Sequence, residues 1–266
     1  MEKPQKNFKL VTEKRARVIL PNIFTLVGVC IGLSSIKFAF DNKFEIAIVA
    51  IIAAAIIDGL DGRIARLLKG TSKVGKELDS LTDVISFGVA PAFIMYFWSL
   101  NTLGRVGWLI CLAYVVCVAL RLARFNVNSE TEASWKDNFF EGIPSPAGGV
   151  LVLTPLVFSL SEFKFFEIDY NLIVPSLFVI ISILLISKIP TYSFKKIVVP
   201  RSTTIFLLFS IVLLFGLLLI FPFKALIIGC VFYLFLIPAS GIHFLKLKKD
   251  LKNESNLNDQ EPEDVL

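Results

Sequence analysis

The chain has 266 residues, of which 55% are hydrophobic and only 18% charged, with a net charge of +5 and a mean hydropathy of +0.74. A soluble domain has roughly 45–50% apolar and about 25% charged residues, so this composition excludes an ordinary soluble protein, and 15 Gly and 12 Pro without a short period exclude a collagen-like chain. Four scattered Cys and a single His also exclude a disulfide framework, a CxxC metal site and any mechanism that needs two histidines. The sequence therefore predicts an all-α integral membrane protein.

The predicted elements begin with a basic segment, residues 1–20, which indicates either a solvated flank or an amphipathic segment on the inner leaflet. Apolar segments of about the length that spans a bilayer follow. We expect eight, near 21–40, 44–66, 78–99, 105–125, 147–161, 171–187, 203–221 and 224–244. Residues 21–200 then form one membrane domain, 201–245 a C-terminal pair of transmembrane helices, and 246–266 a polar disordered tail.

Lysine and arginine are distributed unequally between the two sides of this eight-span topology. Twenty-two of the 27 basic residues lie on the side that holds both termini, and five lie on the other side. Cytoplasmic loops of membrane proteins carry the excess of Lys and Arg. The count therefore places both termini in the cytoplasm and predicts an even number of spans.

Four carboxylates lie where the second and third spans meet. Asp58 and Asp61 come at the end of the second span, and Asp79 and Asp83 at the start of the third. Their spacing places each pair on one face of a helix, and the short connection makes the two helices antiparallel neighbours. Four converging carboxylates in a poorly hydrated site need a cationic partner, and Mg²⁺ or Mn²⁺ suits oxygen ligands that share a phosphate.

Small and basic residues around these acids favour a phosphate ligand. Gly62, Ala65 and Gly75 lie on the same helical faces and allow a ligand to approach the backbone, and Arg66 offers a fork of donors to phosphate oxygens. Further donors nearby are Lys69, Thr71, Ser72 and Lys73. A structural alternative, in which Asp58 and Asp61 pair with Arg63 or Arg66 and Asp79 caps a helix, accounts for single pairs but not for the whole set.

The acidic motif resembles the signature of a known family. DGLDGRIAR at residues 58–66, followed by Gly75, Asp79 and Asp83, matches every fixed position of the CDP-alcohol phosphotransferase signature, eight positions over 26 residues. Three further segments resemble the phosphatidylserine synthase branch of that family: PNIFT at 21–25, RLARFN at 121–126 and FEGIPSPA at 140–147. The similarity covers about residues 15–200, and it implies that 21–200 is a catalytic domain which transfers a phosphatidyl group from CDP-diacylglycerol to the hydroxyl of L-serine and releases CMP.

The resemblance also implies roles for individual residues. Asp58, Asp61 and Asp79 hold one or two Mg²⁺ or Mn²⁺ ions, and Asp83 completes the metal site and is the candidate general base for the serine hydroxyl. The residues that bind the CDP-lipid are then Asn22, Thr25, Gly62, Ala65, Arg66, Ser72 and Gly75.

For the acceptor we expect a site around the end of the fourth span. Arg121 and Arg124 are one turn apart on one helix face and are candidates to bind the serine carboxylate or the lipid phosphate, with Asn126 and Ser145 near the ammonium group. The alternative is that the two arginines anchor the helix among lipid headgroups on the cytoplasmic side.

The sequence leaves three functions open: the serine-transferring enzyme, a sister enzyme that uses glycerol 3-phosphate, choline or an inositol phosphate, and a transporter with an ion-coupling acidic site. For the enzyme we expect a multi-pass protein of the bacterial inner membrane with its active site facing the cytoplasm. Its expected partners are CDP-diacylglycerol, L-serine and membrane lipids, with no nucleic acid, and the resemblance implies a homodimer through membrane helices.

Overall fold

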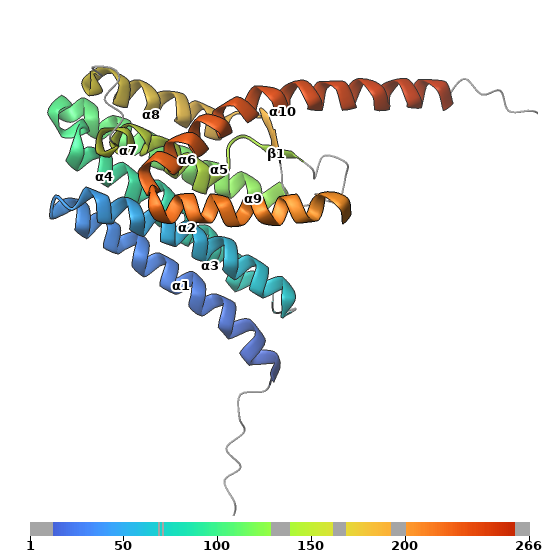
Figure 1. Cartoon of the computed structure of the whole chain (residues 1–266), viewed down its shortest axis with the longest axis horizontal. Coiled ribbons are helices and arrows are strands. Elements are labelled where there is room, and N and C mark those ends of the chain that lie inside the picture. Colours follow the sequence, from blue (N-terminus) through green and yellow to red (C-terminus); the bar gives the residue numbers. More distant parts are fainter. Residues whose placement is uncertain are drawn as a thin grey trace, which may run out of the picture.

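The protein is a bundle of helices with one small two-stranded sheet (Figure 1). The computed structural model describes residues 13–68, 70, 72–128, 139–161, 169–192 and 201–258. In chain order, the helices are α1 (Glu13–Phe40), α2 (Phe44–Leu67), α3 (Lys73–Asp83), the π-helix η1 (Val84–Val89), α4 (Ala90–Trp98), the 3₁₀ helix η2 (Leu100–Leu103), α5 (Arg105–Asn128), α6 (Ser145–Val152), α7 (Thr154–Leu160), α8 (Tyr170–Ile186), α9 (Arg201–Ile220) and α10 (Pro222–Asn258). The strands are β1 (Phe139–Glu141) and β2 (Pro190–Tyr192).

Helices α1 and α2 form an antiparallel hairpin along one side of the bundle (Figure 1). The chain turns at Asn42, whose φ of 59° is a left-handed conformation that asparagine tolerates better than most residues. Ala47 and Ala54 are among the small residues on the buried face of α2, where they permit close helix packing. The hairpin places the end of α2, which carries Asp58 and Asp61, beside the first half of α1.

The predicted third span is built from three helices, α3, η1 and α4, that follow one another without a break. In η1 the backbone N–H of Ala90 bonds to the carbonyl of Ile85, five residues earlier, which is the hydrogen bond of a π-helix. The Phe87 carbonyl within η1 accepts a hydrogen bond of 2.8 Å from the Tyr114 hydroxyl of α5. This bond between η1 and α5 holds the widened turn directly after Asp83.

The predicted fifth span, residues 147–161, is two short helices in the structure, α6 and α7. Pro155 at the start of α7 has no N–H to donate, so the helix ends and begins again at this point. The predicted segment is therefore interrupted at Leu153, and its role as a membrane span stays a prediction.

The small sheet, which the sequence did not predict, joins the connection before α6 to the one after α8. Strands β1 and β2 pair antiparallel, with Phe140 opposite Thr191. Gly142 follows β1 with a φ of 74°, donates its N–H to the Ile189 carbonyl at 2.9 Å and accepts the Thr191 hydroxyl at 2.7 Å. The pairing fixes the entry to α6, whose first residue is Ser145.

The core includes residues of η1, α4, α5, α6 and α8, with further members from α1, α2, α7 and α10. Phe87, Tyr114 and Phe178 are fully buried there, and the rings of Tyr114 and Phe178 meet edge to face with centroids 5.2 Å apart. Outside this core, large apolar side chains such as Phe206, Phe209 and Phe235 are exposed. Such a surface needs an apolar surrounding.

Four stretches among the described residues are long and apolar enough to cross a membrane: Ile19–Phe40, Lys73–Trp98, Arg105–Val127 and Pro222–Lys246. Together with the nearly complete helical content, they confirm the predicted class of an all-α membrane protein. The number of spans and the side of each terminus stay predictions.

The last helix, α10, runs across the bundle and projects beyond it at its C-terminal end (Figure 1). It continues through residues 246–258, which were expected to belong to a disordered tail, and the remaining residues 259–266 lie outside the described part of the chain. Residues 1–12 of the predicted basic segment, and Lys69 and Thr71 of the predicted phosphate donors, also lie outside it.

Candidate active site

Three carboxylates meet between α2 and α3. One oxygen each from Asp58, Asp61 and Asp79 lies within 4.8 Å of the others. Asp61 is buried, and the other two are partly buried. The structure thus brings these three predicted metal ligands together, and a set of hard oxygen donors at this separation fits a divalent cation of the Mg²⁺ or Mn²⁺ type.

Asp83, one turn after Asp79 on α3, lies deeper in the same cluster. Asp83 is 9% exposed, and its carboxyl group interacts electrostatically with those of Asp58 and Asp79. Ionised carboxylates repel one another in this position, so the cluster needs a proton or a cation. The Asp83 Oδ1 atom is buried and has no hydrogen-bond partner among the described residues, which leaves one acceptor free for a ligand.

Thr25 of α1 holds Asp61 in place. Its hydroxyl lies 2.7 Å from Asp61 Oδ2 and 3.1 Å from the Pro21 carbonyl of its own helix. A hydroxyl has one proton to donate, and the ionised carboxylate is both nearer and the stronger acceptor. Thr25 therefore orients a carboxylate of the cluster.

A cavity of about 500 Å³ opens beside the carboxylates. Asp61 and Asp79 contribute to its wall, and Arg66, Lys73 and Lys76 provide positive charges. Its remaining lining residues are Pro21, Asn22, Thr25, Gly62, Ala65, Gly70, Ser72 and Gly75. All seven residues expected to bind the CDP-lipid thus line this cavity, together with cations that suit a pyrophosphate.

Sequence reasoning did not single out Pro21, Gly70 or Lys76 for this cavity. Lys76 follows Gly75 and lies one turn before Asp79, so the helical period of α3 could have found it. The Lys76 ammonium also donates to the Asn126 carbonyl of α5 at 3.2 Å.

Gly75 permits the start of α3 to lie against α1. Ser72 caps the helix by accepting the Gly75 N–H at 2.9 Å. A Cβ at position 75 would lie 2.9 Å from Asn22 Oδ1 and 3.1 Å from Ser72 Oγ. Only glycine therefore leaves the Asn22 side chain and the helix cap in their positions on the cavity wall.

The residues expected around the acceptor separate into three places. Arg121 is buried and donates to the Ser145 hydroxyl at 2.7 Å, and it interacts electrostatically with Asp83. Arg124 donates to the Ile186 carbonyl at the end of α8, also at 2.7 Å. The Asn126 amide donates to the Ser80 hydroxyl of α3 at 2.9 Å. The structure therefore brings Arg121, with its partner Ser145, to the carboxylates, whereas Arg124 bonds to the last carbonyl of α8.

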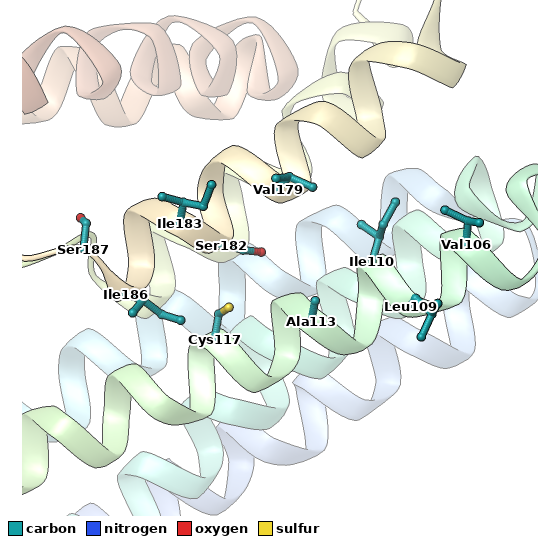
Figure 2. A pocket seen from close by; sticks show the side chains of 10 residues that line it. All are labelled: Val106, Leu109, Ile110, Ala113, Cys117, Val179, Ser182, Ile183, Ile186 and Ser187. Carbon is teal, nitrogen blue, oxygen red and sulfur yellow. The ribbon is translucent and has the colours of Figure 1, made fainter.

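A second cavity, of about 560 Å³, lies between α5 and α8 (Figure 2). Its walls carry almost only apolar side chains, and Cys117, Ser182 and Ser187 are the exceptions among its lining residues (Figure 2). None of the described residues that line it is charged. It is unsuited to phosphate chemistry, whereas the cavity beside the carboxylates has acidic and basic lining residues and is the candidate active site.

The sequence profile of the CDP-alcohol phosphatidyltransferase family matches residues 18–186. The chain belongs to this family. The match contains every carboxylate of the cluster and every lining residue of the cavity beside it. It ends at the last residue of α8, so β2, α9 and α10 lie outside it.

Relatives in three bacteria carry the name CDP-diacylglycerol–serine O-phosphatidyltransferase. The protein of Mycobacterium leprae is 49% identical over 144 residues, 53% of this chain and 48% of the relative. That of Helicobacter pylori strain 26695 is 40% identical over 179 residues, which are 67% of this chain and 74% of the relative. That of Bacillus subtilis is 32% identical over 181 residues, which are 66% of this chain and 92% of the relative. The chain thus matches about half the length of the mycobacterial relative.

Proposed function

We propose that this protein transfers the phosphatidyl group of CDP-diacylglycerol to the hydroxyl of L-serine and releases CMP. The observation that carries the proposal is the carboxylate cluster, with the free acceptor atom of Asp83, beside a cavity lined by Arg66, Lys73 and Lys76. The names of the relatives support L-serine as the acceptor.

The cavity supplies the groups that a CDP-linked lipid needs. Arg66 and the two lysines pair with the pyrophosphate, and Arg66 offers a planar fork of donors to two of its oxygens. The exposed apolar surface of the neighbouring helices accommodates the acyl chains. Asn22 and Ser72 add hydrogen-bonding groups near the N-terminal end of α3.

The carboxylates fit a divalent metal. We assign Asp58, Asp61 and Asp79 as its ligands, with Asp83 completing the set, and one or two Mg²⁺ or Mn²⁺ ions as the cofactor. When bound, such an ion offsets the negative charge of the phosphates and stabilises the leaving CMP. Thr25 keeps Asp61 oriented toward that position.

Asp83 is the proposed general base. As the serine oxygen forms its bond to the lipid phosphorus, the hydroxyl proton moves to the Asp83 carboxylate and the bond between phosphorus and the CMP oxygen breaks. The Oδ1 atom can take this proton because no group in the described part of the chain donates to it.

The membrane arrangement that accompanies this function is the eight-span topology with both termini and the active site on the cytoplasmic side of the bacterial inner membrane. The support is the concentration of 22 of the 27 basic residues on one side of that topology. A homodimer is part of the same proposal and rests on the family resemblance alone.

The experiment is release of CMP from CDP-diacylglycerol by the purified protein with Mn²⁺ or Mg²⁺, with L-serine, glycerol 3-phosphate, choline or no acceptor. We expect release that depends on L-serine and falls roughly 10²–10⁴-fold in Asp83→Asn. Asp169→Asn, at the exposed start of α8, is the matched control and should keep full activity.

Each other outcome points elsewhere. Release driven by glycerol 3-phosphate or choline would assign the protein to a sister reaction of the family. Absence of metal-dependent release with every acceptor would overturn the proposal and favour ion-coupled transport.

A further inference from the structure

Three buried side-chain atoms lack a hydrogen-bond partner in the described part of the chain: Asp83 Oδ1, Arg121 Nε and the Tyr233 hydroxyl. They are not scattered, because Arg121 interacts electrostatically with both Asp83 and Tyr233. Buried polar groups are ordinarily paired, and leaving one unpaired is costly. Three such atoms around one arginine indicate a place for a small polar ligand.

Tyr233 comes from α10, outside the family match and outside the residues expected to form the catalytic domain. One face of α10 packs against the rest of the protein, and its members recur at helical spacing: Phe223, Leu226, Ile227, Cys230, Tyr233, Ile237 and Ser240. The Ser240 hydroxyl donates to the Pro190 carbonyl of β2 at 2.6 Å. This packing holds Tyr233 on the inward side of α10.

The neighbours of these atoms are already engaged elsewhere. Arg121 uses one terminal nitrogen for the Ser145 hydroxyl, which leaves Nε–H as a free donor. The Tyr233 hydroxyl lies near Arg121 and Thr191 but makes no hydrogen bond of ordinary length and angle, and Thr191 donates to the Gly142 carbonyl. The cluster therefore presents two donors, from Arg121 and Tyr233, and one acceptor, from Asp83.

A ligand that satisfies all three atoms carries an anionic acceptor group near a hydroxyl. The serine carboxylate can accept from both donors, while its hydroxyl, separated from the carboxylate only by Cβ and Cα, donates to Asp83. Arg121 interacts with both Tyr233 and Asp83. This arrangement suits serine, with the Arg121 cation beside the serine carboxylate and the Asp83 base beside the serine hydroxyl.

We propose that Tyr233 binds the carboxylate of the acceptor together with Arg121 Nε and thereby selects an amino acid as the acceptor. The inference rests on the proposed function and adds to it a specificity residue from the C-terminal helix. An acceptor without a carboxylate leaves two buried donors unpaired, and sites of this kind reject such analogues strongly.

The test compares Tyr233→Phe with the unchanged protein in CMP release, using L-serine and serinol, in which a hydroxymethyl group replaces the carboxylate. We expect the KM for L-serine to rise about tenfold or more, because a hydrogen bond to a charged group is lost. The kcat/KM for serinol and the KM for CDP-diacylglycerol should stay unchanged. Tyr96→Phe, on α4 at the aromatic cluster with Trp108, is the matched control and should change none of these values.

Stability separates a binding role from a structural one. Because the Tyr233 hydroxyl has no hydrogen-bond partner among the described residues, Tyr233→Phe should not lower the Tm. Tyr114→Phe, which removes the bond to the Phe87 carbonyl, should lower it.

Three results would overturn the inference: an unchanged KM for L-serine, an equal loss with L-serine and serinol, or a rise confined to the KM for CDP-diacylglycerol, which would assign the two donors to a lipid phosphate. If the unchanged protein releases no CMP with L-serine, the proposed function itself fails. If it does release CMP and Tyr233→Phe behaves identically, only the role of Tyr233 fails.

Discussion

The hydrogen bond between Thr25 and Asp61 links α1 to the carboxylate cluster and can be removed with little change of shape. Thr25→Val replaces the hydroxyl with a methyl group of similar size at a residue that is only 4% exposed. Asp61 is still present in this variant but loses the hydroxyl that orients its Oδ2 atom. The expected effect is weaker binding of the metal.

The magnitude follows from the contact itself. A hydrogen bond to an ionised group contributes about 1.5–3 kcal/mol. At about 1.4 kcal/mol for each factor of ten, this corresponds to a roughly 10- to 100-fold weaker site, and groups that orient metal ligands have effects of the same size. The contact of the same hydroxyl with Pro21 is longer, at 3.1 Å, and its loss matters less because it stays within one helix.

The assay is the Mn²⁺ concentration that gives half-maximal CMP release. We expect this concentration to rise roughly 10- to 100-fold in Thr25→Val, with a nearly unchanged kcat at saturating Mn²⁺. Thr82→Val is the control, since the buried Thr82 hydroxyl donates to the Leu78 carbonyl of its own helix at 2.9 Å and contacts no carboxylate in the hydrogen bonds of the described residues. An equal shift in both variants, or no shift in Thr25→Val, would refute the assignment of Thr25 to Asp61.

Two further predictions concern the elements that support the site. Arg124→Met removes the donor to the Ile186 carbonyl and should lower the free energy of unfolding by about 1–3 kcal/mol, with an unchanged KM for L-serine. A raised KM for L-serine at unchanged stability would instead indicate that Arg124 binds the acceptor. Gly142→Ala forces a side chain onto a residue with φ of 74°, where its Cβ would lie 2.8 Å from the Leu185 carbonyl and 2.9 Å from the Ser187 carbonyl, and should cost at least about 2–3 kcal/mol in thermal unfolding. Gly216→Ala, where a Cβ meets open space in α9, should be neutral or stabilising, and equal effects of the two glycine variants would contradict the reasoning.

The carboxylate cluster was predictable because it depends on local geometry. The helical period fixes which residues of α2 share a face with Asp58, and a short connection requires α3 to return beside it. Arg121 and Arg124 show where this reasoning stops. Their spacing places both on one face of α5, but the Ile186 carbonyl that engages Arg124 belongs to α8, 62 residues away. Only the tertiary structure shows that contact.

Other features had no usable signal in the sequence. Strands β1 and β2 have three residues each, too few for an alternating pattern to show. Tyr233 lies in a helix so apolar that a single phenol is indistinguishable from the aromatic side chains that face lipid. Its neighbours Arg121 and Thr191 come from α5 and β2, so its position depends on three segments that are distant along the chain.

The π-helix η1 has a consequence for insertions and deletions in this segment. A π-helical turn is an α-helical turn that holds one additional residue, and η1 places that residue between Asp83 and the core-facing part of α4. Deletion of one residue from Val84–Val89 would leave an ordinary α-helical turn and keep α3 and α4 aligned. If the segment instead wound as a regular α-helix with all of its residues kept, α3 would rotate by about 100° relative to α4. Asp79 and Asp83 would then turn away from Asp58 and Asp61 although every side chain of the acidic motif was still present. The number of residues in the π-helical turn, and not only the composition of the helix, therefore aligns the two halves of the acidic cluster.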